Sequence, residues 1–462
     1  MSSLVKTPIH ELDPLVRNQT FDEVVTGYTL EEAMKEANRC LECKHAPCMK
    51  GCPVNVRIPE FIHEVKEGNI QKAYEILVSE NRLPAICGRV CPQENQCEGK
   101  CVRGIKGEPV AIGRLERFVA DTVEGKAQVL DAKLLKKTLP YKVAVIGSGP
   151  AGLTCAAELA QEGIQVTLYE ALHKIGGVLT YGIPEFRLPK ALIEKEKDKL
   201  VQLGVEIKTD TLIGRSYTID QLKEMGFDAV FIGSGAGLPR FMNIPGESLN
   251  GVYSANEYLT RVNLMKAYEE DARTPIKKSG NVVVIGGGNV AMDAARTAKR
   301  LGADQVSVVY RRSLEELPAR AEEIHHAMEE EIKFNTLWNP VEIIGDGVNV
   351  TAIQCQQMEL GEADASGRRR PVPVENSYKE IPCDTVIIAI GQTPNPLIKM
   401  STPGIETYDF GGIKVNEETM ETNMPLIYAG GDAVTGAATV IKAMGAGKVA
   451  SKEILKQFIQ KN

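Results

Sequence analysis

The cysteines of this chain are crowded into one short segment, and this crowding limits the possible folds more than any other feature. Eight of the 11 cysteines in the 462-residue sequence lie between Cys40 and Cys101. Thiols only a few residues apart can converge on one metal centre, and four thiolates commonly hold a zinc ion or an iron–sulfur cluster. The segment is therefore predicted to fold around two metal centres. The eight cysteines form two runs, which are Cys40, Cys43, Cys48 and Cys52, and then Cys87, Cys91, Cys97 and Cys101.

Two cysteine–proline pairs favour iron–sulfur clusters over zinc. Cys52 and Cys91 each precede a proline, and a cysteine run ending in Cys-Pro is typical of bacterial ferredoxins, where the last cysteine binds the other cluster. The gap between Cys43 and Cys48 departs from that pattern, because it is longer than in ferredoxins. We predict two [4Fe–4S] clusters, with two zinc ions as the alternative. If cysteines of one run bind both clusters, one of the eight cysteines can remain without a cluster, and a carboxylate can serve as a ligand in its place.

The chain around these cysteines has the periodicity of helices. Apolar residues recur at helical spacing in residues 28–39, 58–66, 70–80 and 111–123, and Thr29 and Asn69 suit helix starts. Residues 1–138 are therefore expected to form a helical domain around two clusters. The other three cysteines, Cys155, Cys355 and Cys383, are isolated and are expected to be small buried residues.

A dinucleotide-binding pattern follows this domain. Residues 143–146 predict a buried parallel strand, residues 153–162 a helix, and residues 166–169 a second strand that ends in Glu170. Between the first strand and the helix stand Gly147, Gly149 and Gly152. Such glycines allow a tight turn and close approach of pyrophosphate to the backbone, and the acid can bind ribose hydroxyls. Because all these parts occur together, we predict an FAD site here.

The pattern recurs in the second half of the chain. A strand over 282–285 and a helix over 292–301 enclose a loop, and a strand over 306–310 follows. Val309 stands where the first unit has its acid, and Arg311 and Arg312 come directly after the strand. Two guanidinium groups without a carboxylate suit the 2′-phosphate of NADP(H), with a solvated arginine pair as the alternative. The residues expected to hold NADP(H) are Gly286, Gly288, Asn289, Ala291, Arg311 and Arg312.

A third glycine-rich piece lies near the C-terminal end. A buried strand over 385–390 precedes it, Gly431 and Asp432 lie within it, and a helix over 437–457 follows. Two nucleotide loops followed by this C-terminal segment predict an α/β fold with two Rossmann-like domains, in addition to an α-helical N-terminal iron–sulfur domain. The NADP(H)-binding domain (256–382) would be inserted in the FAD-binding domain (139–255 and 383–462). Within the insert, residues 314–334 are expected to form a solvated helix and residues 368–370 a loop.

Composition argues against several other classes of protein. The net charge of −7 and the pI near 5.7 disfavour a nucleic-acid partner, and an aromatic content of 5% leaves few residues for base stacking. No apolar run reaches the roughly 20 residues that a membrane helix needs. The first residues carry no apolar leader. We therefore expect a cytoplasmic protein without membrane contact, in which disulfides are unfavourable.

These segments together resemble a known family. Residues 147–170, 286–312 and 429–432 resemble the flavoproteins of the disulfide-reductase class, and with residues 40–101 the chain is similar to the glutamate synthase small-subunit family. That family includes the large subunit of the NADH-dependent reduced ferredoxin:NADP oxidoreductase and the N-terminal part of dihydropyrimidine dehydrogenase. Residues 88–92 and 107–117 look most like the transhydrogenase branch.

The resemblance implies particular ligands. It adds Gly177, Gly431 and Asp432 to the FAD site, and it leaves Cys87 spare. Without the resemblance, Glu116 would be interpreted as an ordinary exposed helix acid. One implied cluster would take Cys40, Cys43, Cys48 and Cys101, and the other would take Cys52, Cys91, Cys97 and Glu116.

The favoured function is that of an NADPH-dependent oxidoreductase subunit that passes electrons between NADP(H), FAD and two [4Fe–4S] clusters. Flavin chemistry needs no general acid or base from the protein, so none is predicted. We expect the large subunit of an electron-bifurcating ferredoxin:NADP(H) transhydrogenase, partnered by a small NAD(H)-binding flavoprotein subunit and by ferredoxin. The alternative is the small subunit of NADPH-dependent glutamate synthase, partnered by its large subunit.

Two further classes compete less well. A self-sufficient disulfide reductase would need a cysteine pair near its flavin, and Cys355 and Cys383 are far apart in the sequence. A zinc-stabilised nucleotide-binding scaffold is the more distant alternative.

Overall fold

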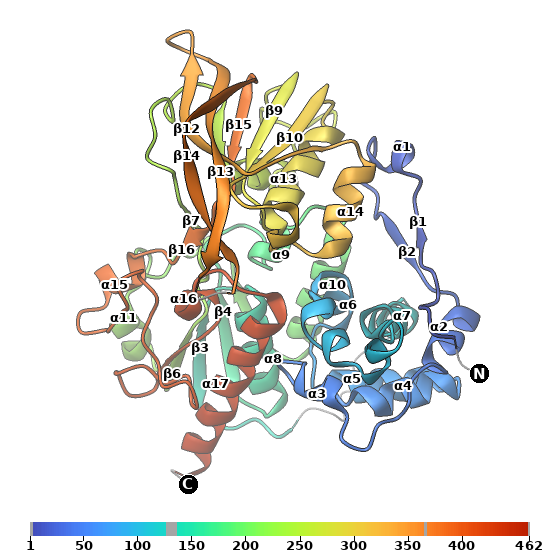
Figure 1. Ribbon diagram of the computed structural model, residues 1–462. Helices are drawn as coiled ribbons and strands as arrows, with labels where there is room; N and C mark the ends of the chain where they lie inside the picture. The colour runs from blue at the N-terminus through green and yellow to red at the C-terminus, as the bar shows by residue number, and fades with distance from the viewer. Residues whose placement is uncertain (1–2, 126–135, 365–366, 461–462) are drawn as a thin grey trace.

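The computed structural model describes residues 3–125, 136–364 and 367–460. Within them the chain forms a helical N-terminal domain and two domains built on parallel sheets (Figure 1). The N-terminal helices lie beside the first sheet, and the second sheet lies above it in this view. One continuous hydrophobic core joins the N-terminal helices to the first sheet and its helices.

The N-terminal domain contains the helices that the sequence predicts. Thr29 caps its first long helix in a capping box, because its hydroxyl accepts from the Glu32 N–H while Glu32 accepts from the Thr29 N–H. Asn69 also stands at a helix start, but its side chain donates to Glu64 instead of capping the helix. The helices of this domain are α2 (Leu30–Ala37), α3 (Pro47–Lys50), α4 (Ile58–Lys66), α5 (Ile70–Val78), α6 (Pro84–Val90) and α7 (Ile112–Glu124).

Before these helices, the chain forms an extended arm that the sequence analysis did not predict. The arm contains β1 (His10–Glu11), α1 (Pro14–Arg17) and β2 (Val25–Gly27), and the two strands pair antiparallel. Figure 1 shows it reaching from the helical domain to α14 (Ala321–Glu329) of the second sheet's domain.

The first sheet is parallel throughout, in the order β17-β6-β3-β4-β5. It is covered by helices that include α17, which packs on α8 so closely that a Cβ at Gly447 would lie 2.3 Å from the Ala151 carbonyl oxygen. The strands are β3 (Lys142–Ile146), β4 (Gln165–Tyr169), β5 (Glu206–Lys208), β6 (Ala229–Ile232) and β17 (Ile427–Ala429). The helices of this domain are α8 (Pro150–Gln161), α9 (Val178–Tyr181), α10 (Lys190–Gln202), α11 (Ile219–Glu224), α15 (Leu397–Ser401), α16 (Asp432–Thr435) and α17 (Val440–Gln460).

The second sheet is also parallel, in the order β11-β10-β9-β15-β8. Its strands are β8 (Val252–Ser254), β9 (Asn281–Ile285), β10 (Gln305–Tyr310), β11 (Lys333–Thr336) and β15 (Thr385–Ile388). Because β8 and β15 both belong to this sheet, the inserted domain is wider at each end than residues 256–382. A buried apolar run has the same pattern in either sheet, so residues 385–388 did not reveal which sheet they join. The helices α12 (Ala255–Leu259) and α13 (Asn289–Arg300) complete this domain with α14.

Three long antiparallel strands project from the second domain, in the order β12-β13-β14. They are β12 (Trp338–Gly345), β13 (Val350–Ala363) and β14 (Arg369–Pro382). The expectation of a loop at residues 368–370 is therefore wrong for Arg369 and Arg370, which begin β14 and pair with β13. A short ladder of β7 (Leu238–Pro239) with β16 (Gln392–Thr393) lies where the chain passes between the two domains.

The acidic stretch 314–334 is not a solvated helix. It contains a single 3-10 turn (Leu314–Glu316), then α14, and then the edge strand β11. Glu323 and His326 of α14, and Glu330 just after it, are buried. Glu323 and Glu330 pair with arginines from other parts of the chain, and those arginines could not be predicted from residues 314–334 alone.

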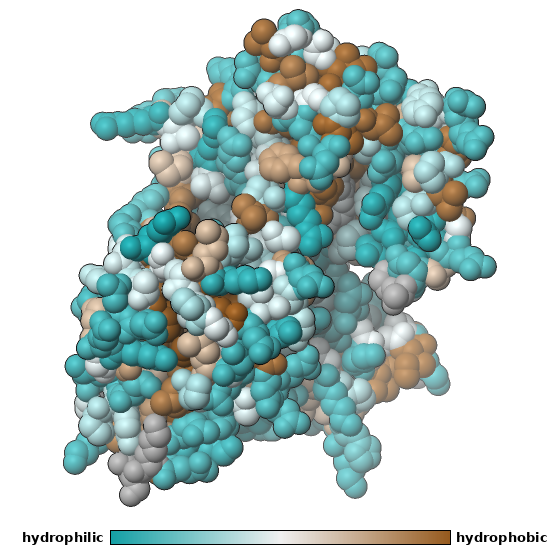
Figure 2. Space-filling model, turned by 90° about the vertical axis from the view of Figure 1, so that its left-hand side faces the viewer, coloured by the Kyte–Doolittle hydropathy of each residue, from teal (hydrophilic) through white to brown (hydrophobic). Residues whose placement is uncertain are grey.

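Hydrophilic residues predominate on the face shown in Figure 2, and hydrophobic side chains form small separate groups there. Among the described residues, no helix combines the length and the apolarity needed to cross a membrane.

Candidate functional site

The first glycine loop has the shape that a bound pyrophosphate requires. Gly147 adopts a φ of +92°, which favours glycine, and a Cβ at Gly152 would lie 1.9 Å from the Gly147 carbonyl oxygen. Gly149 stands at the N-cap of α8, and a Cβ placed on it would meet no protein atom within 4 Å. Two glycines therefore close the turn, while the third leaves open space at the positive end of a helix, where phosphate can bind.

Glu170 lies at the carboxyl end of β4 and is held in place by this loop. One of its carboxylate oxygens accepts from the Ser148 N–H at 3.0 Å and from the Ser148 hydroxyl, and the other accepts from the Leu172 N–H at 2.9 Å. The Ser148 hydroxyl in turn accepts from the Gly176 N–H at 2.9 Å. The acid and the glycine loop thus form one preorganised unit.

Residues far apart in the sequence lie around the first glycine loop. A Cβ at Gly177 would lie 3.0 Å from the Gly149 Cα, and one at Gly431 would lie 3.1 Å from the Ala151 Cβ. Burial raises the pKa of Asp432 to about 6, and its carboxylate accepts from the Ala438 N–H at 3.2 Å. Burial also raises the pKa of Tyr181 to about 12, with Asp432 and Glu170 acting in the same direction. The structure therefore brings the predicted FAD residues together.

The second glycine loop repeats the geometry with one difference. Gly286 adopts a φ of +139°, and a Cβ there would lie 2.3 Å from the Ala389 carbonyl oxygen. Gly288 stands at the N-cap of α13, and a Cβ added to it would have no protein atom within 4 Å. Ala291 replaces the third glycine and is fully buried. The loop therefore also leaves open space at a helix N-terminus, as an NADP(H) phosphate requires.

The two arginines after β10 have different surroundings. Arg311 is exposed, whereas Arg312 is buried. Arg312 pairs with Asp364 through Nη2 and Oδ2 at 2.5 Å, and its Nε donates to the Arg369 carbonyl at 2.8 Å. Arg312 thus connects β10 to the three-stranded sheet of β12, β13 and β14, whereas the Arg311 side chain is exposed to solvent.

Four of the clustered thiols face one shared cavity. Cys40, Cys43, Cys48 and Cys101 line it together with apolar residues that include Ile58 and Ile62. Burial raises the pKa of Cys48 to about 11, and the neighbouring Cys101 and Cys40 act in the same direction. We name these four residues the outer set, because each is half-buried. This is the first ligand set that the family resemblance implies.

A second group combines the half-buried Cys52 with the buried Cys91, Cys97 and Glu116. Burial raises the pKa of Cys52 to about 11, and Glu116 and Cys91 beside it add to that effect. The pKa of Cys97 is raised by burial and by Glu98, Glu116, Cys91 and Cys52. We name Cys52, Cys91, Cys97 and Glu116 the inner set. The structure thus gathers the second implied ligand set as well.

Glu116 is not the exposed helix acid that its position on α7 alone suggests. Its side chain is buried, and burial raises its pKa to about 8. Its Oε1 accepts from the Asn81 amide at 2.6 Å, which partly offsets the effect of burial. A buried carboxylate that faces thiols and is oriented by an amide has the donor chemistry of a metal ligand.

Cys87 lies beside the inner set but has partners of its own. Its Sγ lies 3.6 Å from the Asn81 Oδ1 and 3.5 Å from the Met444 Sδ. Its hydrogen bond with Cys91, together with burial, raises the pKa of Cys91. Asn81 therefore contacts both Cys87 and Glu116. The thiol sets are thus neighbours without the geometry of a single-ion site, because among the described residues no three His, Cys, Asp or Glu side chains lie close enough to bind one metal ion.

The inner set adjoins the first nucleotide-binding domain through α17. Met444 contacts Cys87, and a Cβ at Gly445 would lie 3.3 Å from the Pro53 carbonyl oxygen, next to Cys52. The Lys448 ammonium donates to the Glu80 carbonyl at 2.9 Å. Residues next to the inner set therefore contact α17 of the first domain.

Sequence reasoning did not identify several residues of these sites. Ser148 had a local signal, because it stands inside the glycine loop. Asn81, Tyr181, Asp364 and Met444 had none, since each reaches its site only through a distant part of the chain.

Comparison with known proteins agrees with this architecture. A family described as dihydropyrimidine dehydrogenase domain II, 4Fe-4S cluster, matches residues 17–128, and a family described as pyridine nucleotide-disulphide oxidoreductase matches residues 141–447. The iron–sulfur match is evidence against the zinc alternative. Both matches confirm the predicted fold class and an oxidoreductase with FAD, NADP(H) and 4Fe–4S cofactors.

Individual relatives identify the family more narrowly than the two domain matches do. The glutamate synthase [NADPH] small chain of Halomonas elongata is 39% identical over 444 residues, which cover 95% of this chain and 93% of the relative. The NADP(+)-dependent formate dehydrogenase subunit beta of Moorella thermoacetica is 39% identical over 431 residues, covering 88% of this chain and 59% of the relative. The structure of Mycobacterium tuberculosis FprA in complex with NADPH shares the fold, with a TM-score of 0.58, 21% identity, and coverage of 70% of this chain and 85% of that one. On these grounds the chain belongs to the glutamate synthase small-subunit family of NADPH-dependent FAD and iron–sulfur oxidoreductases.

Proposed function

We propose that this chain is the small subunit of an NADPH-dependent glutamate synthase, which oxidises NADPH and delivers electrons to a larger, glutamine-using partner subunit. When bound, FAD accepts hydride and releases electrons singly, which iron–sulfur clusters can carry onward. The chain's own residues bind and orient these groups. The first glycine loop and Glu170 would hold FAD, the second loop and Arg311 would hold NADPH, and the two thiol sets would hold two [4Fe–4S] clusters.

The different burial of the two thiol sets is the observation that supports this proposal. Cys87, which lies beside the inner set, contacts Met444 of α17 in the first domain, and Cys91 and Cys97 of the inner set are buried. The outer set is half-buried, and Leu41 beside it is 52% exposed. Electrons that leave the first domain can therefore pass the inner set and reach the surface at the outer set.

The named relatives favour glutamate synthase over the transhydrogenase branch that residues 88–92 and 107–117 suggested. Three relatives named as glutamate synthase small chains are 35–39% identical to this chain over 95% of its length. The two stretches also have a packing reason, because a Cβ at Gly88 would lie 2.7 Å from the Arg117 backbone nitrogen.

Reconstitution with candidate partners tests the proposal. We expect NADPH oxidation to support glutamine-dependent glutamate formation when a glutamate synthase large subunit is added. Cys48→Ser, in the outer set, should leave flavin reduction by NADPH intact and abolish glutamate formation. Coupling of NADPH oxidation only to ferredoxin and an NAD(H)-binding flavoprotein subunit would overturn the proposal in favour of the transhydrogenase.

A further inference from the structure

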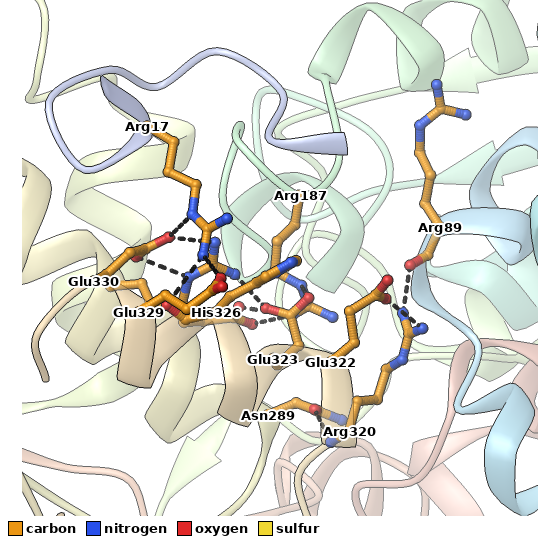
Figure 3. Close-up of polar contacts among 12 residues, drawn as sticks. Arg17, Arg89, Arg187, Asn289, Arg320, Glu322, Glu323, His326, Glu329 and Glu330 are labelled. Atoms are coloured by element: carbon orange, nitrogen blue, oxygen red, sulfur yellow. Dashed lines mark hydrogen bonds and ion pairs between the residues drawn. The ribbon is translucent and has the colours of Figure 1, made fainter. Parts of the chain in front are cut away.

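Arg320 connects the second glycine loop to the inner thiol set. It lies directly before α14 and is 6% exposed. Its backbone N–H donates to the Asn289 Oδ1 at 2.9 Å, and the N–H of the preceding Ala319 donates to the Gly287 carbonyl at 3.1 Å. Asn289 and Gly287 both belong to the loop that would hold NADP(H). The backbone of Arg320 is therefore attached to the nucleotide loop, as Figure 3 shows for Asn289.

The side chain of Arg320 points the other way, to the chain on both sides of Cys91. Its Nη1 donates to the Arg89 carbonyl at 2.7 Å, as Figure 3 shows. Its Nη2 donates to the Gln93 Oε1 at 2.9 Å. Arg89 and Gln93 precede and follow Cys91 by two residues. The next N–H, that of Ala321, donates to Glu94 at 3.2 Å. One short segment thus contacts the nucleotide loop with its backbone and the Cys91 loop with its side chain.

Arg320 also places a buried positive charge beside the inner set. Glu322 pairs with its Nη2 at 2.7 Å, Glu94 lies 3.8 Å from its Nε, and the Nε has no hydrogen-bond partner. The guanidinium therefore donates on both sides of Cys91, to the Arg89 carbonyl and to the Gln93 side chain. Removing such a cation from a site of low dielectric constant changes the energy of every charge nearby.

We propose that Arg320 is a positioning residue that couples nucleotide binding at the second glycine loop to the reduction potential of the cluster at the inner set. The inference rests on the proposed function for both sites. Reduction adds a negative charge to a cluster, so a nearby cation raises its potential, and charge and hydrogen bonding are known levers on that potential. Nucleotide phosphates at Asn289 would offset part of the Arg320 charge. By linkage, the oxidation state of the cluster changes nucleotide affinity by the same factor.

The test compares variants of the complete protein in redox titrations followed by electron paramagnetic resonance. The probe is 2′-phospho-ADP-ribose, which carries the phosphates of NADP(H) without a nicotinamide. In the wild type, a saturating concentration of the probe should lower the potential of one cluster. In the absence of the probe, Arg320→Met should lower the potential of the same cluster by about 59 mV, which is about a tenfold change in the equilibrium constant of a one-electron reduction. The probe should then produce no further shift in that variant.

Three matched variants separate coupling from a loss of structure. Arg320→Lys keeps the charge and should restore most of the potential. Asn289→Ala releases the backbone of Arg320 from the loop, so it should remove the shift in potential that the probe produces at saturation, with saturation verified by titration of the probe. Arg17→Met removes a buried arginine that pairs with Glu330 at the opposite end of α14, so it should leave the potential and the probe shift unchanged.

The outcomes distinguish this inference from the proposed function. If Cys91→Ser removes neither cluster, the ligand assignment behind the proposed function is wrong. Suppose instead that two clusters are present and that Cys91→Ser removes one of them. If Arg320→Met then changes neither reduction equilibrium by more than about twofold, the coupling inference is overturned while the proposed function stands. If Arg320→Met does not fold, Arg320→Lys and Asn289→Ala decide by the same criteria. A shift as large in Arg17→Met would mean that loosening of α14, and not Arg320, controls the potential.

Discussion

At the scale of single residues, Glu116 illustrates how environment changes a role that sequence leaves open. On α7 it has the spacing of an ordinary helix acid, but it is buried between Asn81 and the inner thiols. A solvent-facing acid could be removed at a cost within about 0.5 kcal/mol. A ligand could not be removed without changing the metal centre.

Glu116 and Cys87 therefore provide a paired prediction. Glu116→Ala should lower the iron content or change the spectrum of one cluster, while flavin content and flavin reduction by NADPH stay intact. Cys87→Ser should have little effect on the clusters, because its thiol has Asn81 and Met444 as partners. Iron analysis and electron paramagnetic resonance measure both. If Cys87→Ser destroys a cluster and Glu116→Ala changes nothing, all the ligands are cysteines.

Arg311 and Arg312 predict the choice of nucleotide. The double variant to alanine should weaken NADPH binding far more than NADH binding, by roughly 10–150-fold for the loss of one charge-assisted contact worth about 1.5–3 kcal/mol. Arg311→Ala should account for most of the loss, because Arg312 already pairs with Asp364. Dissociation constants for both nucleotides decide the matter. Equal losses for NADPH and NADH would mean that the arginines serve the structure only.

Lys190 predicts a dependence of stability on pH. Its Nζ donates to the Leu188 carbonyl at 2.8 Å, and burial lowers its pKa to about 7, although Glu185 and Asp293 oppose that effect and Arg187 adds to it. An unfolded lysine has a pKa near 10.4 and so binds more protons than the folded one between about pH 7 and 10. The free energy of unfolding should therefore rise with pH in that window, by at most about 1.4 kcal/mol per unit.

Lys190→Met provides the control for this pH effect. Urea unfolding at pH 7.5 and pH 9 should show a smaller rise in the variant than in the wild type, because methionine has no proton to lose. Equal rises in the two proteins would assign the pH dependence to other groups.

At the scale of elements, α14 and the N-terminal arm are held together by a buried charge network. Arg17 of the arm pairs with Glu330 at 3.0 Å (Figure 3). Arg296 and Arg300 of α13 pair with the same carboxylate at 2.8 and 2.7 Å. Arg187 of the first domain reaches Glu323 at 3.1 Å. These contacts join the arm and both nucleotide domains, and they explain why an acidic helix can be buried. The pKa of Glu330 is lowered to about 2, because Arg296 and Arg300 outweigh the cost of its burial.

Glu330→Gln tests this network, with Glu329→Gln as the control. Removing the charge of Glu330 leaves buried arginines without compensation, and breaking a buried pair in this way costs about 3–5 kcal/mol. Glu329 pairs only at the rim of the network and is 33% exposed, so its variant should lose about 1 kcal/mol or less. Denaturant titration measures both. Equal effects would contradict a buried network centred on Glu330.

At the scale of the whole molecule, the three domains share contacts that place their cofactor sites in one assembly. The hydrophobic core of the helical domain continues into the first sheet, and Met444 of α17 contacts Cys87 beside the inner set. The arm and Arg320 attach the second domain to the same helices. Binding of nucleotide and electron transfer to the thiol sets can therefore influence each other without large motions.

The cofactor content of the whole chain is a direct prediction. Protein purified without oxygen should contain about eight irons and about one flavin per chain. Iron analysis and the visible spectrum measure these values. About four irons would leave one thiol set without a cluster, and stoichiometric zinc with little iron would contradict the iron–sulfur assignment altogether.

The sequence by itself determined the local units of this protein. The two glycine loops, the acid after β4, the helices around the cysteines and the cysteine runs were all predictable, because each depends on residues close together in the chain. Iron–sulfur chemistry followed from cysteine spacing in the same way. The ligand set with Glu116 came from family resemblance, and the burial of that acid beside Asn81 was visible only in the structure.

Tertiary structure alone decided how these units meet. Residues 385–388 have the pattern of any buried strand, and only pairing with β9 and β8 assigns them to the second sheet. The acids of α14 looked solvated until arginines from three other segments surrounded them. Arg320 had no signal at all in the sequence. Periodicity records which face of an element is apolar, but not which distant residues will cover it, because those contacts form only when the whole chain packs.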